Sequence, residues 1–326
     1  MAQPLTTTQV STLISSAIGF TWESTEDLVD KCYPKFLREY STPHARLISD
    51  PVAYFGEVPK LAEGAQIEYD DFGVGTALTI APEQFALGVR ATKAALLDMG
   101  KNPFGEFSTA KLVTAAKFGE AFRRSMSQTM DVYAAQVLLN GNSATESAKW
   151  IGSGNNSEAL YADTHTIVKD TSILGGNTYD NLLAASTLSQ SALNTAIEST
   201  ETQPTQEGLV RSLAESWTLV CGPANRTNAY EAVETAKMGK LADSFDHNKV
   251  ALSNYDIKVV VNPFLGSSST RYAIFRPGHK VGYWISQKPE LDDEVDFETK
   301  GHKWSVYARW RFFHLDSFGT CLSLGA

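Results

Sequence analysis

The clearest pattern of apolar positions along the chain lies at residues 108–140 and predicts a long helix. Its apolar residues are spaced by three or four positions, which places them on one face of a helix. Ser108 or Thr109 is suited to cap the start, and Asn140-Gly141 supplies a stop signal. At the usual rise per residue this helix spans roughly 50 Å, enough to act as a spine. The apolar positions are Leu112, Ala115, Gly119, Phe122, Met126, Met130, Tyr133 and Val137.

Residues 46–93 show the short apolar runs and the turn residues of β-strands. Turn chemistry at Asp70-Asp71-Phe72-Gly73 and at Gly75 separates an outgoing arm from a returning arm. The outgoing arm contains Val52, Tyr54 and Phe55 and then Gln66–Tyr69, and the returning arm contains Ala77–Ile80 and Phe85–Val89.

Both arms are polar, contain several glycines and hold too few large aliphatic residues to form a compact core. We therefore expect a long two-stranded hairpin, with arms of about 15 residues that reach roughly 50 Å. An isolated hairpin is only marginally stable in water, so this one would need a partner surface. The alternative is an ordinary hairpin that packs on its own domain.

Two stretches before residue 46 have helical character, Ser11–Ile18 and Ser24–Tyr40. In the second, apolar residues recur at every fourth position, which favours an apolar helical stripe. Pro34 interrupts it, so we do not expect a long regular helix there. The recurring residues are Leu28, Cys32, Phe36 and Tyr40.

The middle of the chain begins with residues 141–176, which are rich in Gly, Asn and Ser and predict loops. Tyr179–Glu198 predicts a helix with leucines on its inner face. These leucines are Leu182, Leu183, Leu188 and Leu193.

Trp217–Cys221 predicts a buried strand, because it is a short apolar run that ends at Gly222-Pro223. Asn225 is suited to cap a helix that runs to about Lys237. The polar stretch Lys240–Val250 predicts an exposed loop.

Residues 255–326 return to strands. Ile257–Val261 is a continuous apolar run that ends at Asn262-Pro263. In Trp304–Phe313 large apolar residues alternate with polar ones, so Arg309 and Arg311 share one face of the strand. Two further strands are expected at Tyr272–Phe275 and Val281–Ile285, and the fold class is therefore α+β.

Composition limits the class of protein. A length of 326 residues with 43% hydrophobic content permits one large domain or two modest ones and excludes a disordered chain. A net charge of −9 argues against a protein whose task is to grip phosphates, although a container for nucleic acid can be acidic. No apolar stretch approaches 18 residues and the polar N-terminus lacks a signal peptide, so we expect no membrane span. Three scattered cysteines, Cys32, Cys221 and Cys321, fit a reducing compartment and buried structural roles.

No catalytic motif emerges from the sequence. It contains no phosphate-binding loop, dinucleotide fingerprint, HExxH or GxSxG. Asp163 is suited to orient His165, but no nucleophile lies near them in the sequence. We therefore predict no enzyme activity, no catalytic residue and no cofactor.

The acidic run Glu290–Glu298 is the best candidate for a metal site, because carboxylates at alternating positions suit calcium or magnesium. It does not fit the EF-hand pattern. We interpret it as a solvated charged loop and predict no metal ligands; a patch that docks on a neighbour's basic surface is a further alternative.

The basic candidates are the Arg123-Arg124 pair and Arg309 with Arg311. A nucleic-acid-binding protein would use them on phosphates. Surface ion pairs within the fold, which contribute little, are a second interpretation. In an assembling protein they would pair across a subunit boundary and set register.

From about residue 45 onward, the order and spacing of several stretches resemble one family. The chain resembles the tailed-phage major capsid proteins of the Hong Kong 97 type, in the group of the Mu-like prophage major head subunits. The stretches are Val58–Ala65, Phe85–Val89 and Thr92–Asp98 around the hairpin, Asp131–Gly141 at the end of the long helix, Leu160–His165 before Gly175-Gly176-Asn177, and Val306–Arg309 through Asp316–Gly319.

The resemblance implies a phage capsid fold with an N-terminal arm, an extended hairpin loop, a spine helix and an axial domain. Residues 54–90 would lie over the adjacent subunit, and Lys237–Val250 would lie near the capsomer centre. Some relatives crosslink through a Lys and an Asn near a Glu, but Lys60 and Glu63 do not suffice to carry this chemistry over. The implied ranges are 1–45 for the arm, 46–105 for the extended loop and flanking strands, 106–154 for the spine helix of the peripheral domain, 155–260 for the axial domain, and 261–326 for the closing strands of both domains.

The implied function is a major head protein that assembles as pentamers and hexamers into an icosahedral shell. The shell would enclose double-stranded DNA without sequence-specific binding, and it would be built in the bacterial host's cytoplasm into a virion. Scaffold, portal and decoration proteins are the expected partners; residues 1–45 are too short for a scaffolding segment, so we expect a separate scaffold. The candidates for subunit contacts are Glu57, Lys60, Glu63, Tyr69, Asp70, Asp71, Phe72, Arg123, Arg124, Lys240, Asp243, Arg309 and Arg311.

Other functions stay open at this point. An encapsulin-like nanocompartment of the same fold would enclose protein cargo instead of DNA. A soluble α+β enzyme or binding protein would be compact, with a radius of gyration near ~20 Å for this length. A tail or decoration protein would form tubes or bind a preformed shell.

Overall fold

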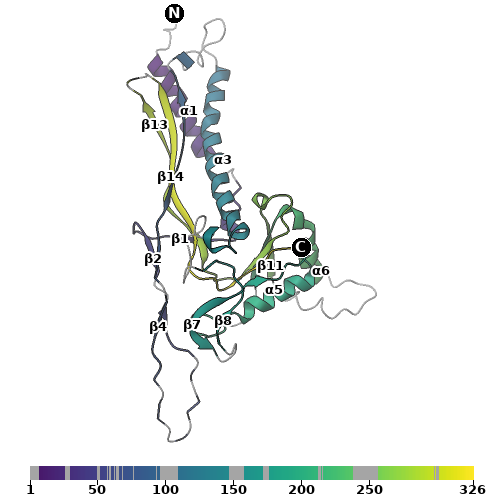
Figure 1. Ribbon diagram of the computed structural model, residues 1–326. Coiled ribbons are helices and arrows are strands. Elements are labelled where there is room, and N and C mark those ends of the chain that lie inside the picture. Colours follow the sequence, from purple (N-terminus) through teal and green to yellow (C-terminus); the bar gives the residue numbers. More distant parts are fainter. Residues whose placement is uncertain are drawn as a thin grey trace, which may run out of the picture. The chain divides into compact units, whose positions relative to one another are not determined.

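The chain is represented by a computed structural model, in which two compact units are distinguished (Figure 1). Unit 1 comprises Met1–Lys31, Pro82–Asp131 and Ile285–Trp310, and unit 2 comprises Cys32–Ala81, Val132–Trp284 and Arg311–Ala326. The structure describes residues 7–25, 30–49, 52–56, 58, 60–61, 63, 66–67, 69–75, 77–92, 94–95, 109–146, 158–171, 176–211, 214, 216–237, 256–296, 298 and 301–326.

Unit 1 contains a sheet whose strands are long and regular. Strand β14 (His302–His314) pairs antiparallel with β6 (Glu83–Ala91), and β13 (Val281–Val295) is the other neighbour of β14. The ends of β13 and β14 belong to unit 2. Residue types alternate along β14, so its apolar side chains share one buried face. In unit 1 these are Trp304, Val306, Ala308 and Trp310.

Two helices lie side by side in unit 1, α1 (Thr7–Ser24) and α3 (Thr109–Leu139), and the last turns of α3 belong to unit 2 (Figure 1). Gly119 allows their close approach, because a Cβ there would lie 2.2 Å from the carbonyl oxygen of Ile18. One turn along α3, the guanidinium of Arg123 lies 4.0 Å from the centre of the Trp22 ring. The contact between these helices therefore depends on a small residue and a stacked cation.

Unit 2 is built around a five-stranded mixed sheet with the order β11-β10-β12-β15-β9. Strand β10 pairs in parallel with β11 and antiparallel with β12, and β15 pairs antiparallel with β12 and in parallel with β9. Strand β15 therefore lies inside the sheet although it is late in the sequence. The strands are β9 (Leu182–Leu183), β10 (Ser216–Cys221), β11 (Asp256–Val261), β12 (Tyr272–Phe275) and β15 (Thr320–Ser323).

Helices α5 (Gln190–Thr202) and α6 (Arg226–Lys237) cover one face of this sheet and form the core of unit 2 with it. The hydroxyl of Ser189 accepts a hydrogen bond from the backbone N–H of Ala192 and so caps the start of α5. The buried core residues are Leu188, Leu193, Ala196, Ile197, Trp217, Leu219, Cys221, Ala229, Ala232, Val233, Ile257, Tyr272, Ile274 and Cys321.

A hairpin from Leu47 to Ile80, called the flap below, also belongs to unit 2 (Figure 1). Its outgoing strands β2 (Leu47–Ser49) and β3 (Val52–Ala53) pair antiparallel with the returning strands β5 (Leu78–Ile80) and β4 (Gly73–Val74). At its root, Leu78 and Ile80 pack in a small apolar cluster with Trp284 and Phe313.

The remaining elements of unit 2 are short. Strand β1 (Arg38–Tyr40) pairs in parallel with the start of β13, and β7 (His165–Thr171) pairs antiparallel with β8 (Gly176–Tyr179). Single 3₁₀ turns occur at Tyr33–Lys35, Pro223–Asn225 and Pro263–Leu265. Within the described part of the chain, no helix has the length and apolar character needed to cross a membrane.

Several predicted elements are confirmed. The predicted spine is α3, the stretch Ser11–Ile18 lies within α1, and the alternating strand is β14. The strands expected at Trp217–Cys221, Ile257–Val261 and Tyr272–Phe275 are β10, β11 and β12, and α6 ends at Lys237 as expected. Asn225 does precede α6, but its side-chain amide donates to the carbonyl oxygen of Thr270.

Other predictions were wrong for reasons of long-range pairing. In Ser24–Tyr40 the interruption expected at Pro34 is present as a 3₁₀ turn, but the helical character expected for the end of this stretch is wrong, because Arg38–Tyr40 is a strand that pairs with β13. The helix expected from Tyr179 begins only at Gln190, because Leu182 and Leu183 pair with β15.

Several other strands also differ from the prediction. The supposed loops of 141–176 include β7 and the start of β8. Phe85–Val89 does not return along the flap but lies in β6, which pairs with β14. Described residues of Gln66–Tyr69 lie outside strands, and the turn expected at Asp70–Gly73 is wrong, because Gly73 lies in β4 on the returning arm. The acidic run expected as a loop continues β13 up to Val295, so β13 is far longer than the predicted Val281–Ile285.

Candidate assembly surface

The flap presents large apolar side chains to solvent. Every described residue from Val58 to Tyr69 is exposed. Val58 retains 93% and Tyr69 retains 91% of its accessible surface. Contiguous exposed apolar residues mark an interaction surface in a water-soluble protein. The exposed apolar residues of the flap are Ile48, Tyr54, Phe55, Val58, Leu61, Ile67, Tyr69, Phe72 and Val74.

Asp70 joins the two arms of the flap where they leave the body of unit 2. Its Oδ2 accepts a hydrogen bond of 3.1 Å from the backbone N–H of Gly56 and pairs with the ammonium of Lys169 on β7. The pKa of the Asp70 carboxyl is lowered, mainly by the hydrogen bond from Lys169 and to a smaller extent by the hydrogen bond from the N–H of Gly56. Phe55 completes this group, since its ring centre lies 5.9 Å from the Lys169 ammonium.

The backbone of β4 lies directly against β7. A Cβ on Gly73 would lie 2.3 Å from Cγ1 of Val168, far inside van der Waals contact, so glycine is required here. The flap is therefore held at its base by a close backbone contact next to the ion pair.

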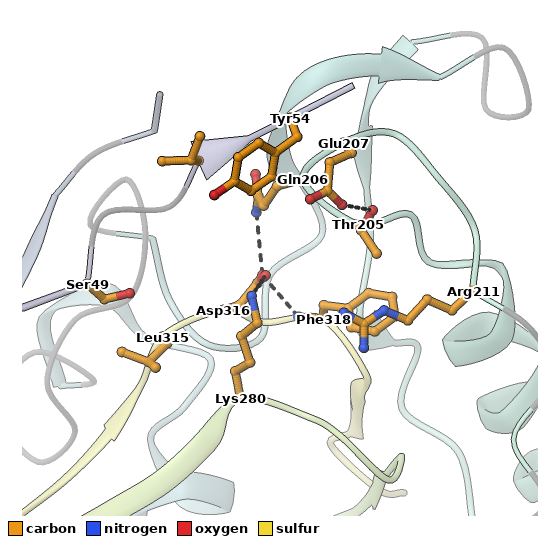
Figure 2. Close-up of a pocket in the computed structure, with 11 residues that line it drawn as sticks. Ser49, Tyr54, Thr205, Gln206, Glu207, Arg211, Lys280, Leu315, Asp316 and Phe318 are labelled. Atoms are coloured by element: carbon orange, nitrogen blue, oxygen red, sulfur yellow. Dashed lines mark hydrogen bonds and ion pairs between the residues drawn. The ribbon is translucent and has the colours of Figure 1, made fainter. Parts of the chain in front are cut away.

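Gln206 connects β7 to the body of unit 2. Its side-chain oxygen accepts from the N–H of Val168 at 3.3 Å, and its backbone carbonyl accepts from the N–H of Lys169 at 3.2 Å. Its side-chain amide donates to Asp316 at 3.4 Å, and the other oxygen of Asp316 lies 3.5 Å from the ammonium of Lys280 (Figure 2). A continuous path of hydrogen bonds and ion pairs therefore runs from the flap base to the segment that follows β14.

A cavity of about 320 Å³ lies between the flap and this path (Figure 2). Its charged groups already have partners: Glu207 accepts from the hydroxyl of Thr205 at 2.8 Å, Asp316 pairs with Lys280, and the guanidinium of Arg211 lies 4.9 Å from the Phe318 ring. The lining residues are Ser49, Val52, Tyr54, Thr205, Gln206, Glu207, Arg211, Lys280, Leu315, Asp316 and Phe318.

His165 belongs to a buried network of hydrogen bonds. Its Nδ1 lies 3.1 Å from Oε2 of Glu158 and its Nε2 lies 2.9 Å from Oδ1 of Asn181. The expected partner Asp163 is replaced by Glu158, and Asn181 is fixed because its amide donates to the carbonyl oxygen of Leu160 at 2.9 Å. Across the described residues, no group of three or more His, Cys, Asp or Glu side chains is arranged to hold a metal ion.

The predicted contact residues of the flap are brought together on one hairpin. Lys60, Glu63, Tyr69, Asp71 and Phe72 are exposed there. Asp70 is half-exposed and has the partners given above. Glu57, Lys240 and Asp243 lie outside the described residues, as does the expected loop Lys240–Val250.

The predicted basic contacts differ in exposure. Arg123 is buried against Trp22, whereas Arg124 is exposed and pairs with Glu120 one turn earlier on α3. Arg309 and Arg311 share one half-buried face of β14, and burial lowers the pKa of Arg311. Arg124 therefore reaches solvent while paired with Glu120, whereas Arg123 contacts Trp22 within the chain.

Sequence reasoning missed Lys169 and Gln206, which hold the flap base. Both are polar residues in stretches that were expected to be loops or carried no element prediction, and their partners lie far away in the sequence. The one local signal is the pattern of His165–Thr171, where polar and β-branched residues mix as in a half-buried strand.

Comparison with known proteins gives one family and one fold. The family model described as "Phage capsid protein" matches residues 75–316. The capsid of the cyanophage P-SCSP1u is similar in structure, with a TM-score of 0.55 at 10% identity over 89% of this chain and 86% of that chain. The mature capsid of bacteriophage PhiM1 has a TM-score of 0.52 at 9% identity, covering 89% and 84% of the two chains.

A structure of Microbacterium phage Oxtober96 has a TM-score of 0.51 at 13% identity, covering 91% of this chain and 93% of that chain. At these identities the likeness shows the shared fold alone. No curated protein matches the sequence.

Proposed function

This chain belongs to the phage capsid protein family and is a shell subunit of a phage virion, and we propose that its flap makes the contact that joins neighbouring copies. The observation that supports this proposal is the exposed apolar surface of the flap, where every described residue from Val58 to Tyr69 faces solvent. A two-stranded hairpin cannot bury such residues within itself. A second copy of the chain would cover them.

We further propose that the shell is icosahedral and of the Hong Kong 97 type, and that the chain belongs to the group of the Mu-like prophage major head subunits. The order of a leading helix, an extended flap, a spine helix and a helix-and-sheet unit supports this subtype. In it, residues 46–105 would form the extended loop and flanking strands, 106–154 the spine of the peripheral domain and 155–260 the axial domain. Residues 1–45 would form the arm and 261–326 the closing strands.

The proposed partners are further copies of the chain, a separate scaffold, a portal and decoration proteins. The role is structural and not enzymatic, and the enclosed double-stranded DNA would be held without sequence-specific contacts. The chain's net charge of −9 supports this, because a wall that does not grip phosphates has no need of a basic surplus.

Negative-stain electron microscopy of the chain expressed alone, together with sedimentation, tests the proposal. Closed shells, or rings of five and six copies, are the expected result. A compact monomer or dimer that stays small on concentration and with added scaffold would reject it. Nuclease treatment and protein analysis of purified shells then separate a DNA container from a nanocompartment filled with protein cargo.

A further inference from the structure

We propose that Lys169 is a positioning residue that fixes the direction of the flap and thereby sets the angle at which neighbouring copies meet. This inference rests on the proposed function of the flap. Lys169 lies on β7, outside the flap.

Lys169 holds both arms of the flap at one level. Its ammonium pairs with Asp70 on the returning arm, and Asp70 also accepts the N–H of Gly56 on the outgoing arm. Phe55, beside Gly56, lies next to the same ammonium. Only 14% of the Lys169 side chain is exposed, whereas 51% of the Asp70 side chain is, so the lysine is held by its surroundings and water reaches the pair from the side of Asp70.

The backbone at Lys169 is fixed by Gln206. Its backbone N–H donates to the carbonyl of Gln206, and the N–H of Val168 donates to the side-chain oxygen of the same residue. Gln206 is bound in turn to Asp316. Lys169 therefore links the flap to the body of unit 2 through its ammonium on one side and its backbone on the other.

No described residue from Val58 to Tyr69 is buried, so the base contacts decide where the flap points. Thirteen residues separate Gly56 from Asp70, and an arm of about seven residues spans at most ~25 Å. A change of roughly 10° at the base would move the tip by about 4 Å, which is close to a full strand spacing. The exposed apolar side chains of the flap would then miss their site on the neighbouring copy or meet it at another angle.

On the side that faces the cavity, no ion pair between described residues holds the flap base, and a Cβ on Gly56 would lie 3.6 Å from the carbonyl oxygen of Glu207. There Val52 and Tyr54 line the cavity of about 320 Å³ and not a packed interface (Figure 2). If the Lys169 contact is lost, the flap has space to turn in that direction. Gly73 would still touch Val168. This van der Waals contact is less directional than the Lys169–Asp70 ion pair, in which Asp70 is also hydrogen-bonded to Gly56 on the other arm.

The test compares Lys169→Met and Asp70→Asn with a matched control, Lys258→Met, which alters an exposed lysine on β11 of the same unit. Hydrogen exchange of the unassembled protein reports on the flap base, and electron microscopy gives the distribution of shell diameters. We expect amides of residues 52–56 and 69–74 to exchange about tenfold faster in both flap-base variants, with the rest of unit 2 unchanged. Shells of these variants should be fewer and broader in diameter, and Lys169→Arg, which keeps the cation, should restore most of the wild-type distribution.

Normal exchange at the flap base, or faster exchange with wild-type shells, would overturn the inference while leaving the proposed function intact. If Lys169→Met does not fold, the half-exposed Asp70→Asn decides the question by the same two measurements. A failure of the wild-type chain to assemble, even with scaffold, would count against the proposed function itself, and exchange at the flap base would still show whether Lys169 restrains the flap.

Discussion

The indole N–H of Trp304 donates a hydrogen bond to the hydroxyl oxygen of Ser15, at a distance of 3.0 Å. This contact ties β14 to α1, and it extends through Nε2 of His302, which lies 3.3 Å from Ser15 Oγ and 3.1 Å from Asp293 Oδ2. Trp304 is almost fully buried, so its N–H depends on this partner. A single serine on the leading helix therefore satisfies a buried donor of the sheet in unit 1.

Replacing Ser15 with alanine should destabilise unit 1. The change leaves the buried indole N–H of Trp304 without its acceptor, which costs about 1–3 kcal/mol of unfolding free energy. Urea unfolding of the unassembled protein, followed by tryptophan fluorescence, measures this cost. Ser16→Ala, at an exposed position of the same helix, is the control and should change stability little. Equal effects of the two variants would contradict the assigned role of Ser15.

Gly119→Ala should also be destabilising, although alanine is the better helix former by about 1 kcal/mol. The added methyl would lie 2.2 Å from the Ile18 carbonyl oxygen and 2.4 Å from Oγ1 of Thr21, so α1 and α3 must move apart. Overpacking of this kind typically costs about 1–3 kcal/mol.

Gly19 offers a control on the opposite helix, since nothing lies within 4 Å of the position that its Cβ would take. Gly19→Ala should therefore raise the melting temperature, and Gly119→Ala should lower it. Thermal unfolding by circular dichroism compares the two. A rise in both variants would show that the helices are not in contact at Gly119.

Two buried histidines should make the protein sensitive to acid. Burial and the neighbouring His165 lower the pKa of His314 to about 3, and burial and Arg38 lower that of His279 to about 4. In the unfolded chain both titrate near ~6.5, so below this pH the unfolded state binds protons that the folded state does not. Stability is therefore full above about pH 6.5 and falls with decreasing pH, by about 2 kcal/mol per histidine at pH 5.

The urea midpoint between pH 7.5 and pH 4.5 measures this dependence. His314→Gln should be less stable at neutral pH, because His314 is fully buried, but its midpoint should fall less steeply with acid. An unchanged slope in His314→Gln would assign the acid sensitivity to other groups.

The flap should be needed for assembly and not for folding. Tyr69→Ser combined with Phe72→Ser removes two exposed aromatic rings, so the unfolding free energy should change by less than about 0.5 kcal/mol. Shell formation should fall at least tenfold, because the lost apolar area is buried only between copies. Sedimentation gives the assembled fraction. Tyr230→Ser, which removes a 40% exposed ring from α6, is the control and should assemble normally.

Elements defined by their own residues were predictable from the sequence. The alternation in β14, the apolar run of β11 and the long periodic stretch of α3 all have a local signal. Strands β1 and β9 do not, because each is a strand only through pairing with a distant one, β13 or β15. The apolar stripe before Tyr40 and the leucines at Leu182 and Leu183 favoured helices in the sequence, but pairing with a distant strand makes both segments strands.

The candidate surface shows the same division. The exposure of the flap was predictable, because its arms are polar, contain several glycines and hold too few large aliphatic residues to form a core. Its support was not visible, since Lys169 and Asp70 are 99 positions apart in the sequence. Arg123 illustrates the converse, because a basic pair on a helix suggests two exposed charges, and only the packing of Trp22 shows that one is buried.

The position of β15 between β12 and β9 imposes an order on biosynthesis. When a ribosome has produced everything up to β14, β12 still has an open edge and β9 has no partner in the sheet. The flap, by contrast, emerges early, so a nascent chain displays its apolar hairpin before the body that directs it is complete. The sheet of unit 2 is therefore completed only after β15 has left the ribosome, so the body that directs the flap takes its final form later than the flap itself.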